Sequence, residues 1–155
     1  MGAVYTPAES RPAAQNEKIA LSDELIGELE TANEWVIGVP MHNFSTPSTL
    51  KLWVDQVVRV GRTFSYREAG PVGLLKGKKI TFLVASGGVY SKGTPMASYD
   101  FVEPYLRALF GFLGITDLDF VVAGGASAVM SGKVDRATFL KPFDEAIDSR
   151  FQAAA

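Results

Sequence analysis

The chain has 155 residues, of which 47% are hydrophobic and 21% are charged, the proportions of a single globular domain with a real core. Its formal net charge of −2 and its scattered Lys and Arg residues argue against nucleic acid and membrane as partners. The absence of Cys excludes disulfides, thiolate catalysis and thiolate metal sites, and the single His argues against a protein-bound zinc site. Without a signal-like N-terminus or a run of membrane-spanning length, the cytoplasm is the expected compartment.

The first part of the chain predicts a helix, a strand and a second helix. Apolar residues share one stripe between Glu17 and Ala32, and Trp35–Val39 is a continuous apolar run typical of a strand buried on both faces. A second helical pattern extends from Leu50 to Val58. We expect Thr46 to be its N-cap, Pro47 its first helical residue and Gly61 its stop.

The same alternation continues to the C-terminus. Residues 80–85 and 118–123 are predicted strands, and a helix from about Asp100 to Gly114 lies between them, with its buried side formed by Phe101, Tyr105, Leu106, Leu109, Phe110 and Leu113. A final helix contains Pro142, which should kink or restart it. Residues 61–78 and 89–99 are predicted long loops, which are usually functional or mobile. This order predicts an α/β fold with three recognisable parallel strands and helices on both faces.

The predicted strands run out into three turns, "PMHNF", "SGGVY" and "GGAS". Ligands of parallel sheets bind beyond the carboxyl ends of the strands, and turns that combine small residues, an amide, a thioether and aromatic rings suit a flat heteroaromatic ligand. Each of these features also has a non-functional interpretation. The glycine pairs can be ordinary turns, Met41 or Phe44 can be core residues, and His42 can be a loop histidine without a role in catalysis. Neither G-x-G-x-x-G nor a P-loop is present.

The blocks "PMHNFSTPSTLKLWVDQVVRVGRTFSY", "GPVGLLKGKK", "SGGVYSKGTP" and "YLRALFGFLGITD" resemble the FMN-dependent NADH-azoreductases, a flavodoxin-like family also described as NAD(P)H:quinone oxidoreductases. The resemblance runs from about Gly2 to the C-terminus, within one domain of residues 1–155. It implies FMN as cofactor, NADH or NADPH as donor, and a quinone or azo compound as acceptor, reduced in ping-pong order by a homodimer. The flavin performs this chemistry, so no catalytic side chain and no metal is expected.

The resemblance also implies which residues form the site. Those expected to contact FMN are Pro40, Met41, His42, Asn43, Phe44, Ala85, Ser86, Gly87, Gly88 and Tyr90. Asn43 and Phe44 would also shape the substrate pocket, with Tyr66 and Phe112 reaching in from the second subunit. Without the resemblance, Phe112 would be interpreted as core and Tyr66 as surface. Tyr is more usual at the His42 position, some relatives carry Arg at Ser86, and many carry Glu at Gly124.

Family members begin with a strand, a Ser-rich phosphate loop, a helix and a second strand, for which residues 1–17 have no room. The sequence is therefore expected to lack the N-terminal part of the fold, to leave the 35–39 strand with an unpaired edge, and to bind FMN weakly. Two hypotheses follow. One is the FMN oxidoreductase, and the other is a truncated fragment or interaction module with weak or no flavin binding and no turnover.

Overall fold

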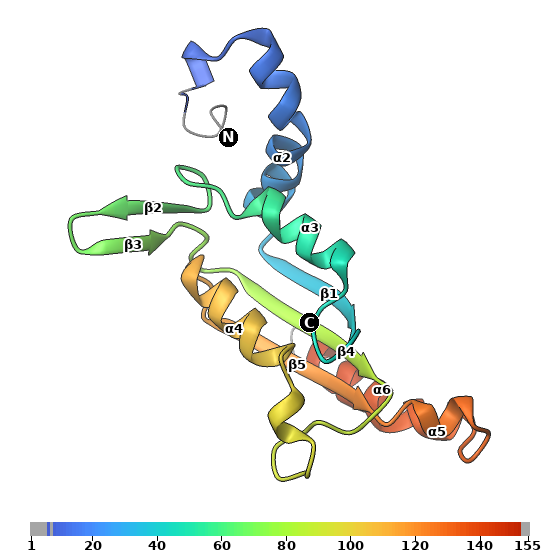
Figure 1. Cartoon of the computed structure of the whole chain (residues 1–155). Coiled ribbons are helices and arrows are strands. Elements are labelled where there is room, and N and C mark those ends of the chain that lie inside the picture. The colour runs from blue at the N-terminus through green and yellow to red at the C-terminus, as the bar shows by residue number, and fades with distance from the viewer. Residues whose placement is uncertain (1–5, 7, 153–155) are drawn as a thin grey trace. The chain divides into compact units, whose positions relative to one another are not determined.

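The structure is a computed structural model that describes residue 6 and residues 8–152 (Figure 1). In chain order its elements are η1 (Ala8–Ser10), α2 (Ala13–Thr31), β1 (Glu34–Pro40), α3 (Ser48–Val57), β2 (Phe64–Arg67), β3 (Gly70–Gly73), β4 (Lys79–Ser86), η2 (Ala97–Tyr99), α4 (Glu103–Phe112), β5 (Asp117–Gly124), α5 (Ser127–Met130) and α6 (Arg136–Gln152). No helix among these is long and apolar enough to cross a membrane.

The chain forms two compact units. Unit 1 comprises Met1–Trp35, Ser48–Lys79 and Arg107–Asp117, and unit 2 comprises Val36–Pro47, Ile80–Leu106 and Leu118–Ala155. Unit 1 therefore holds α2, α3 and the β2–β3 pair. Unit 2 holds nearly all of the larger sheet, together with α5 and α6.

A polar network joins the elements of unit 1. The Ser22 hydroxyl on α2 donates to the Gln56 carbonyl of α3 at 2.6 Å and accepts from Arg59 at 2.8 Å. The Arg59 guanidinium, which is 4% exposed, also forms an ion pair with Asp23. A buried guanidinium is tolerated only where such partners satisfy it, so these contacts fix the chain between α3 and the following hairpin.

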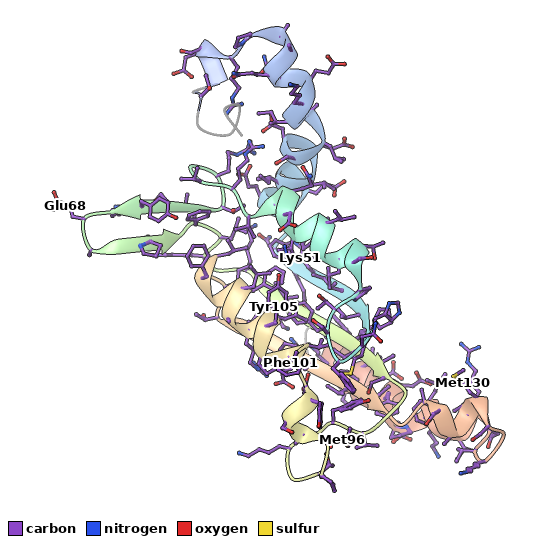
Figure 2. The ribbon with its side chains drawn as sticks, viewed as in Figure 1. Lys51, Glu68, Met96, Phe101, Tyr105 and Met130 are labelled. Atoms are coloured by element: carbon purple, nitrogen blue, oxygen red, sulfur yellow. The ribbon has the colours of Figure 1, made fainter. Side chains whose placement is uncertain are left out.

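The predicted long loop at residues 61–78 contains an antiparallel hairpin, which corrects that expectation. β2 and β3 pair in the register Phe64↔Gly73 to Arg67↔Gly70, and Glu68 lies at the tip (Figure 2). The sequence of β3, Gly-Pro-Val-Gly, has weak strand propensity, so the hairpin depends on pairing with β2.

The sheet of unit 2 has the strand order β1-β4-β5, and its three strands run in parallel (Figure 1). This confirms the predicted α/β class, in which helices flank a parallel sheet. β1 lies at the sheet edge within the described residues. It is not buried on both faces as predicted, because its exposure alternates: Val36 is 51% exposed and Val39 only 1%.

Most predicted apolar positions of the sheet strands and helices are buried or half-buried, but Leu21 (57% exposed), Val122 (38%) and Phe101 are exposed. Phe101 is 55% exposed, whereas the adjacent Val102 is fully buried, and both residues precede α4. α6 runs through Pro142 as one helix, so the chain does not restart there. Its end is held to the sheet by Arg150, which donates to the Thr81 hydroxyl at 2.7 Å and pairs with Asp119.

Candidate functional site

The turn that follows β1 has an unusual backbone. His42 and Ser45 exchange two hydrogen bonds, of 2.9 and 3.0 Å, around the central residues Asn43 and Phe44. Both central residues have positive φ, 47° and 69°, as in a type I′ turn, which normally has Asn followed by Gly. A left-handed conformation at Phe44 costs about 1–2 kcal/mol. The turn therefore stores strain at two of the predicted site residues.

The β1 turn lies beside the end of β4 because the Met41 amide donates to the Ala85 carbonyl at 2.7 Å. Beyond β4, the Gly87-Gly88 segment is tied to the chain that follows β5. The Gly88 carbonyl accepts from the Gly125 amide at 2.9 Å, and the Gly87 carbonyl accepts from the Ser127 hydroxyl at 2.7 Å. The carboxyl ends of the three strands thus form one connected edge within unit 2.

A cavity of about 220 Å³ lies at this edge, lined by Met41, Asn43, Phe44, Gly87, Gly88 and Tyr90. Pockets that hold a complete small-molecule ligand usually measure about 300–1,000 Å³. The cavity is therefore of a size for one flat ring system, or for part of a larger ligand. Six of the predicted contact residues meet here, although they lie in two separate segments of the chain.

Aromatic rings form one wall of the cavity. The Phe44 ring meets Tyr90 edge-on with centroids 5.9 Å apart, and it also packs against Tyr99 at 5.1 Å. A Cβ at position 88 would lie 2.9 Å from the Tyr90 hydroxyl, so a side chain there would push the Tyr90 ring aside. A Cβ at Gly87 would meet no atom within 4 Å. The floor of the cavity is thus bare backbone that a ligand can approach closely.

The other predicted contact residues do not line the cavity. Pro40, His42 and Ala85 are exposed at its border. Ser86 is buried, and its hydroxyl donates to the Gly88 carbonyl at 2.9 Å. Ser86 therefore supports the backbone of the Gly87-Gly88 segment and does not contact the cavity.

Tyr66 and Phe112, the residues predicted to serve a second subunit, both belong to unit 1. They flank Phe64, whose ring centroid is 5.5 Å from Tyr66 and 4.8 Å from Phe112. Tyr66 is 70% exposed, as its surface interpretation predicted. Phe112 is 38% exposed, so its interpretation as a core residue is wrong.

Tyr99 is the aromatic neighbour that the sequence analysis missed. Residues 89–99 were predicted to form a loop, whereas residues 97–99 form the 3-10 turn η2. The close spacing of Met96 and Tyr99 at the end of the predicted loop, directly before Phe101, was the available signal, since aromatic residues are enriched in binding surfaces.

The lining of the cavity carries no ionic side chain, because its six residues are Met, Asn, Phe, Gly, Gly and Tyr. The ion pairs that shift pKa values lie elsewhere, in unit 1. Burial raises the pKa of Asp23, but the hydrogen bond and charge of Arg59 and the charge of Arg62 outweigh burial and hold this pKa below its usual value. The hydrogen bond from Arg62 likewise lowers the pKa of Glu30. Among the described residues, no group of three His, Cys, Asp or Glu could hold a metal ion.

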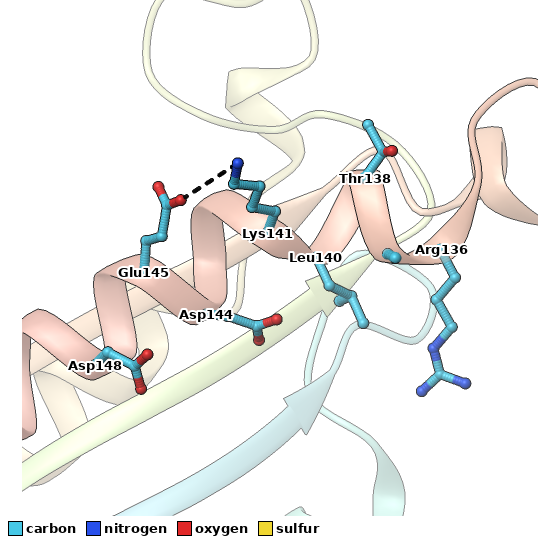
Figure 3. A pocket seen from close by; sticks show the side chains of 8 residues that line it. Arg136, Thr138, Leu140, Lys141, Asp144, Glu145 and Asp148 are labelled. Carbon is cyan, nitrogen blue, oxygen red and sulfur yellow. Dashed lines mark ion pairs between the residues drawn. The ribbon is translucent and has the colours of Figure 1, made fainter.

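A larger hollow of about 730 Å³ lies along α6, but it is not a site of this kind (Figure 3). All eight of its lining residues come from one helix, among them Arg136, Leu140 and Asp144. The ion pair within it, Lys141–Glu145 at 3.9 Å, joins two exposed side chains. A hollow with a single wall cannot surround a ligand, and we therefore place the candidate site at the strand ends.

Comparison with known proteins identifies the family. Residues 3–146 match the model of the flavodoxin-like fold. An FMN-dependent NADH:quinone oxidoreductase of Acidobacterium capsulatum is 56% identical over 142 residues, which are 92% of this chain and 69% of that protein. The chain belongs to the family of FMN-dependent NADH:quinone oxidoreductases, which has the flavodoxin-like fold. A second relative, FMN-dependent NADH:quinone oxidoreductase 3 of Burkholderia lata, is 46% identical over 151 residues, covering 97% of this chain and 73% of its own length.

The solved structures agree with this assignment. The FMN-dependent NADH-azoreductase from Bacillus anthracis, crystallised with FMN, has a TM-score of 0.80 and 31% identity, over 93% of this chain and 66% of that one. The azoreductase AzrA has a TM-score of 0.79 and 28% identity, over 94% of this chain and 70% of that one. The chain thus spans about two thirds of the length of the azoreductases that share its fold, and the resemblance stated from the sequence is confirmed.

Proposed function

We propose that this chain binds FMN at the strand-end cavity and passes reducing equivalents from NADH to a quinone. Two observations support the proposal. The first is membership of a family whose curated relatives are named FMN-dependent NADH:quinone oxidoreductases. The second, which carries the assignment of the site, is the cavity of Met41, Asn43, Phe44, Gly87, Gly88 and Tyr90 at the carboxyl ends of parallel strands.

The residues present fit the flavin ring. The open backbone of Gly87 and Gly88 allows a planar ring to approach closely, and Phe44 and Tyr90 offer aromatic contact at its edge. The Asn43 amide can both donate and accept hydrogen bonds to the polar edge of such a ring. When bound, FMN supplies the hydride chemistry, and the protein contributes orientation and exclusion of water.

No ionic group lines the cavity, so the lining side chains are assigned no acid–base role. We propose that donor and acceptor occupy the same face in turn, in ping-pong order. A quinone is the preferred acceptor because the curated relatives are named for it, and azo compounds, which are also planar, are the second class. NADPH is an alternative donor.

We further propose that the chain acts as a homodimer in which Tyr66 and Phe112 serve the pocket of the second copy. Support comes from their exposure beside Phe64, because clustered exposed aromatic residues are typical of interfaces. Phe112→Lys should then lower the sedimentation coefficient to that of a monomer at micromolar concentration. A parent chain that is itself monomeric at that concentration would refute the dimer.

The experiment that tests the function begins with the visible spectrum of the purified chain and its titration with FMN. We expect flavin absorbance, and NADH oxidation that depends on added benzoquinone. Gly88→Ala should weaken FMN binding, because its Cβ pushes aside Tyr90, which lines the cavity. Gly111→Ala, where a Cβ meets no atom within 4 Å, is the matched control. A colourless chain that ignores FMN would overturn the proposal and favour the interaction module.

A further inference from the structure

The strained turn at Asn43 and Phe44 requires contacts from outside itself. Two successive residues with a Cβ and positive φ persist only where the surroundings determine their conformation. The two hydrogen bonds between His42 and Ser45 close the turn, but they do not orient the Phe44 side chain. Since Phe44 lines the cavity, whatever orients its ring also sets the width of the cavity.

The segment before α4 provides those contacts. The Phe101 amide donates to the Phe44 carbonyl at 3.1 Å, and the Tyr99 ring packs against the Phe44 ring with centroids 5.1 Å apart and planes inclined by 39°. Tyr99 does not line the cavity. It contacts the Phe44 ring, which in turn contacts Tyr90 in the lining.

Tyr99 is itself held on both sides in the chain. Its amide donates to the Met96 carbonyl at 3.0 Å within η2, and the next residue, Asp100, accepts from the Val102 amide at 2.9 Å and the Glu103 amide at 3.2 Å at the start of α4. Figure 2 shows Met96 and Phe101 on this segment. A ring anchored in this way can fix its neighbour without touching a ligand.

We propose that Tyr99 is a positioning residue that acts through Phe44, and that it adapts the pocket to flat acceptors of one or two fused rings, the small quinones. This inference rests on the proposed function. Without the Tyr99 ring, the Phe44 backbone is free to leave its left-handed conformation and the Phe44 ring to leave the cavity wall. The acceptor then loses a contact surface, whereas the glycine floor that faces the flavin is unchanged.

The test compares Tyr99→Ala, Tyr99→Phe and Phe101→Ala. Phe101→Ala removes a neighbouring exposed aromatic ring but keeps the backbone donor to Phe44, so it is the matched control. Because Tyr99 is 45% exposed, we expect all three variants to fold. The first measurement is hydrogen exchange of the Phe101 amide in the flavin-free protein, which Tyr99→Ala should accelerate about tenfold and the other variants should leave within twofold.

The second measurement is steady-state kinetics with benzoquinone and menadione. At saturating FMN, Tyr99→Ala should raise KM for both quinones by a factor of about 3–10, the scale of one aromatic pair, with kcat within twofold of the parent. Unchanged exchange and KM in Tyr99→Ala, or equal effects in Phe101→Ala, would overturn the inference. If the parent fails to reduce quinones, the proposed function fails, and with it the acceptor role. Exchange of the Phe101 amide still decides whether Tyr99 positions Phe44.

Discussion

Replacement of Gly73 by Ala should displace the β2–β3 hairpin from the end of α4. A Cβ at position 73 would lie 2.1 Å from the Leu113 carbonyl carbon and 2.2 Å from the Gly114 nitrogen, both backbone atoms. Non-bonded carbon atoms prefer about 3.5–4.0 Å, so the two segments must separate by more than about 1 Å. That movement breaks the hydrogen bond from the Leu75 amide to the Leu113 carbonyl, which is 2.9 Å long.

The expected cost of Gly73→Ala is about 2–4 kcal/mol. Overpacking contributes about 1–3 kcal/mol and the lost hydrogen bond about 0.5–1.5 kcal/mol. Gly27→Ala is the matched control, because position 27 lies inside α2 with open space for a Cβ. It should stabilise unit 1 by about 0.5–1 kcal/mol through helix propensity.

The assay is urea unfolding followed by tryptophan emission, because both tryptophans, Trp35 and Trp53, belong to unit 1. Gly73→Ala should lower the midpoint, and Gly27→Ala should raise it. A Gly73→Ala midpoint equal to that of the parent would show that the hairpin does not lie against Leu113 and Gly114, and the placement of Tyr66 would have to be revised.

Three further predictions concern single contacts. Phe110→Ala should lower the stability of unit 1 by about 3–5 kcal/mol in the same urea assay, because this fully buried ring lies 6.5 Å from Trp35 and 6.4 Å from Trp53. Asp100→Ala should cost about 1 kcal/mol by removing the carboxylate from the start of α4, measured by urea unfolding followed by circular dichroism. Because the pKa of Asp23 is lowered in the folded chain, its ion pair stabilises the fold fully above the unfolded pKa of about 3.9, and this contribution declines as the pH falls below that value toward the lowered pKa. Asp23→Asn should therefore be less stable than the parent at pH 7, and the gap should narrow as the pH falls below about 4.

The local pattern of the sequence determined the order and type of most elements. The apolar runs at residues 80–85 and 118–123 became β4 and β5, each one residue longer at both ends. β4 is mostly buried, as an apolar run in a parallel sheet predicts, whereas β5 has no buried residue and is recognised by its β-branched and aromatic residues. Gly114, with a φ of 97°, ends the α4 region as predicted, since a residue without a Cβ adopts this conformation readily.

Tertiary contacts decided the hairpin and the shape of the site. Gly70–Gly73 becomes a strand only because β2 supplies its hydrogen-bond partners, and a local pattern contains no information about a partner. The residues of the cavity could be named from the sequence through the family resemblance, but the left-handed backbone of Phe44 could not. Sequence preference places Gly at that position of the turn. Phe44 adopts the left-handed conformation there because Tyr99 and Phe101, more than 50 residues further along the chain, contact it.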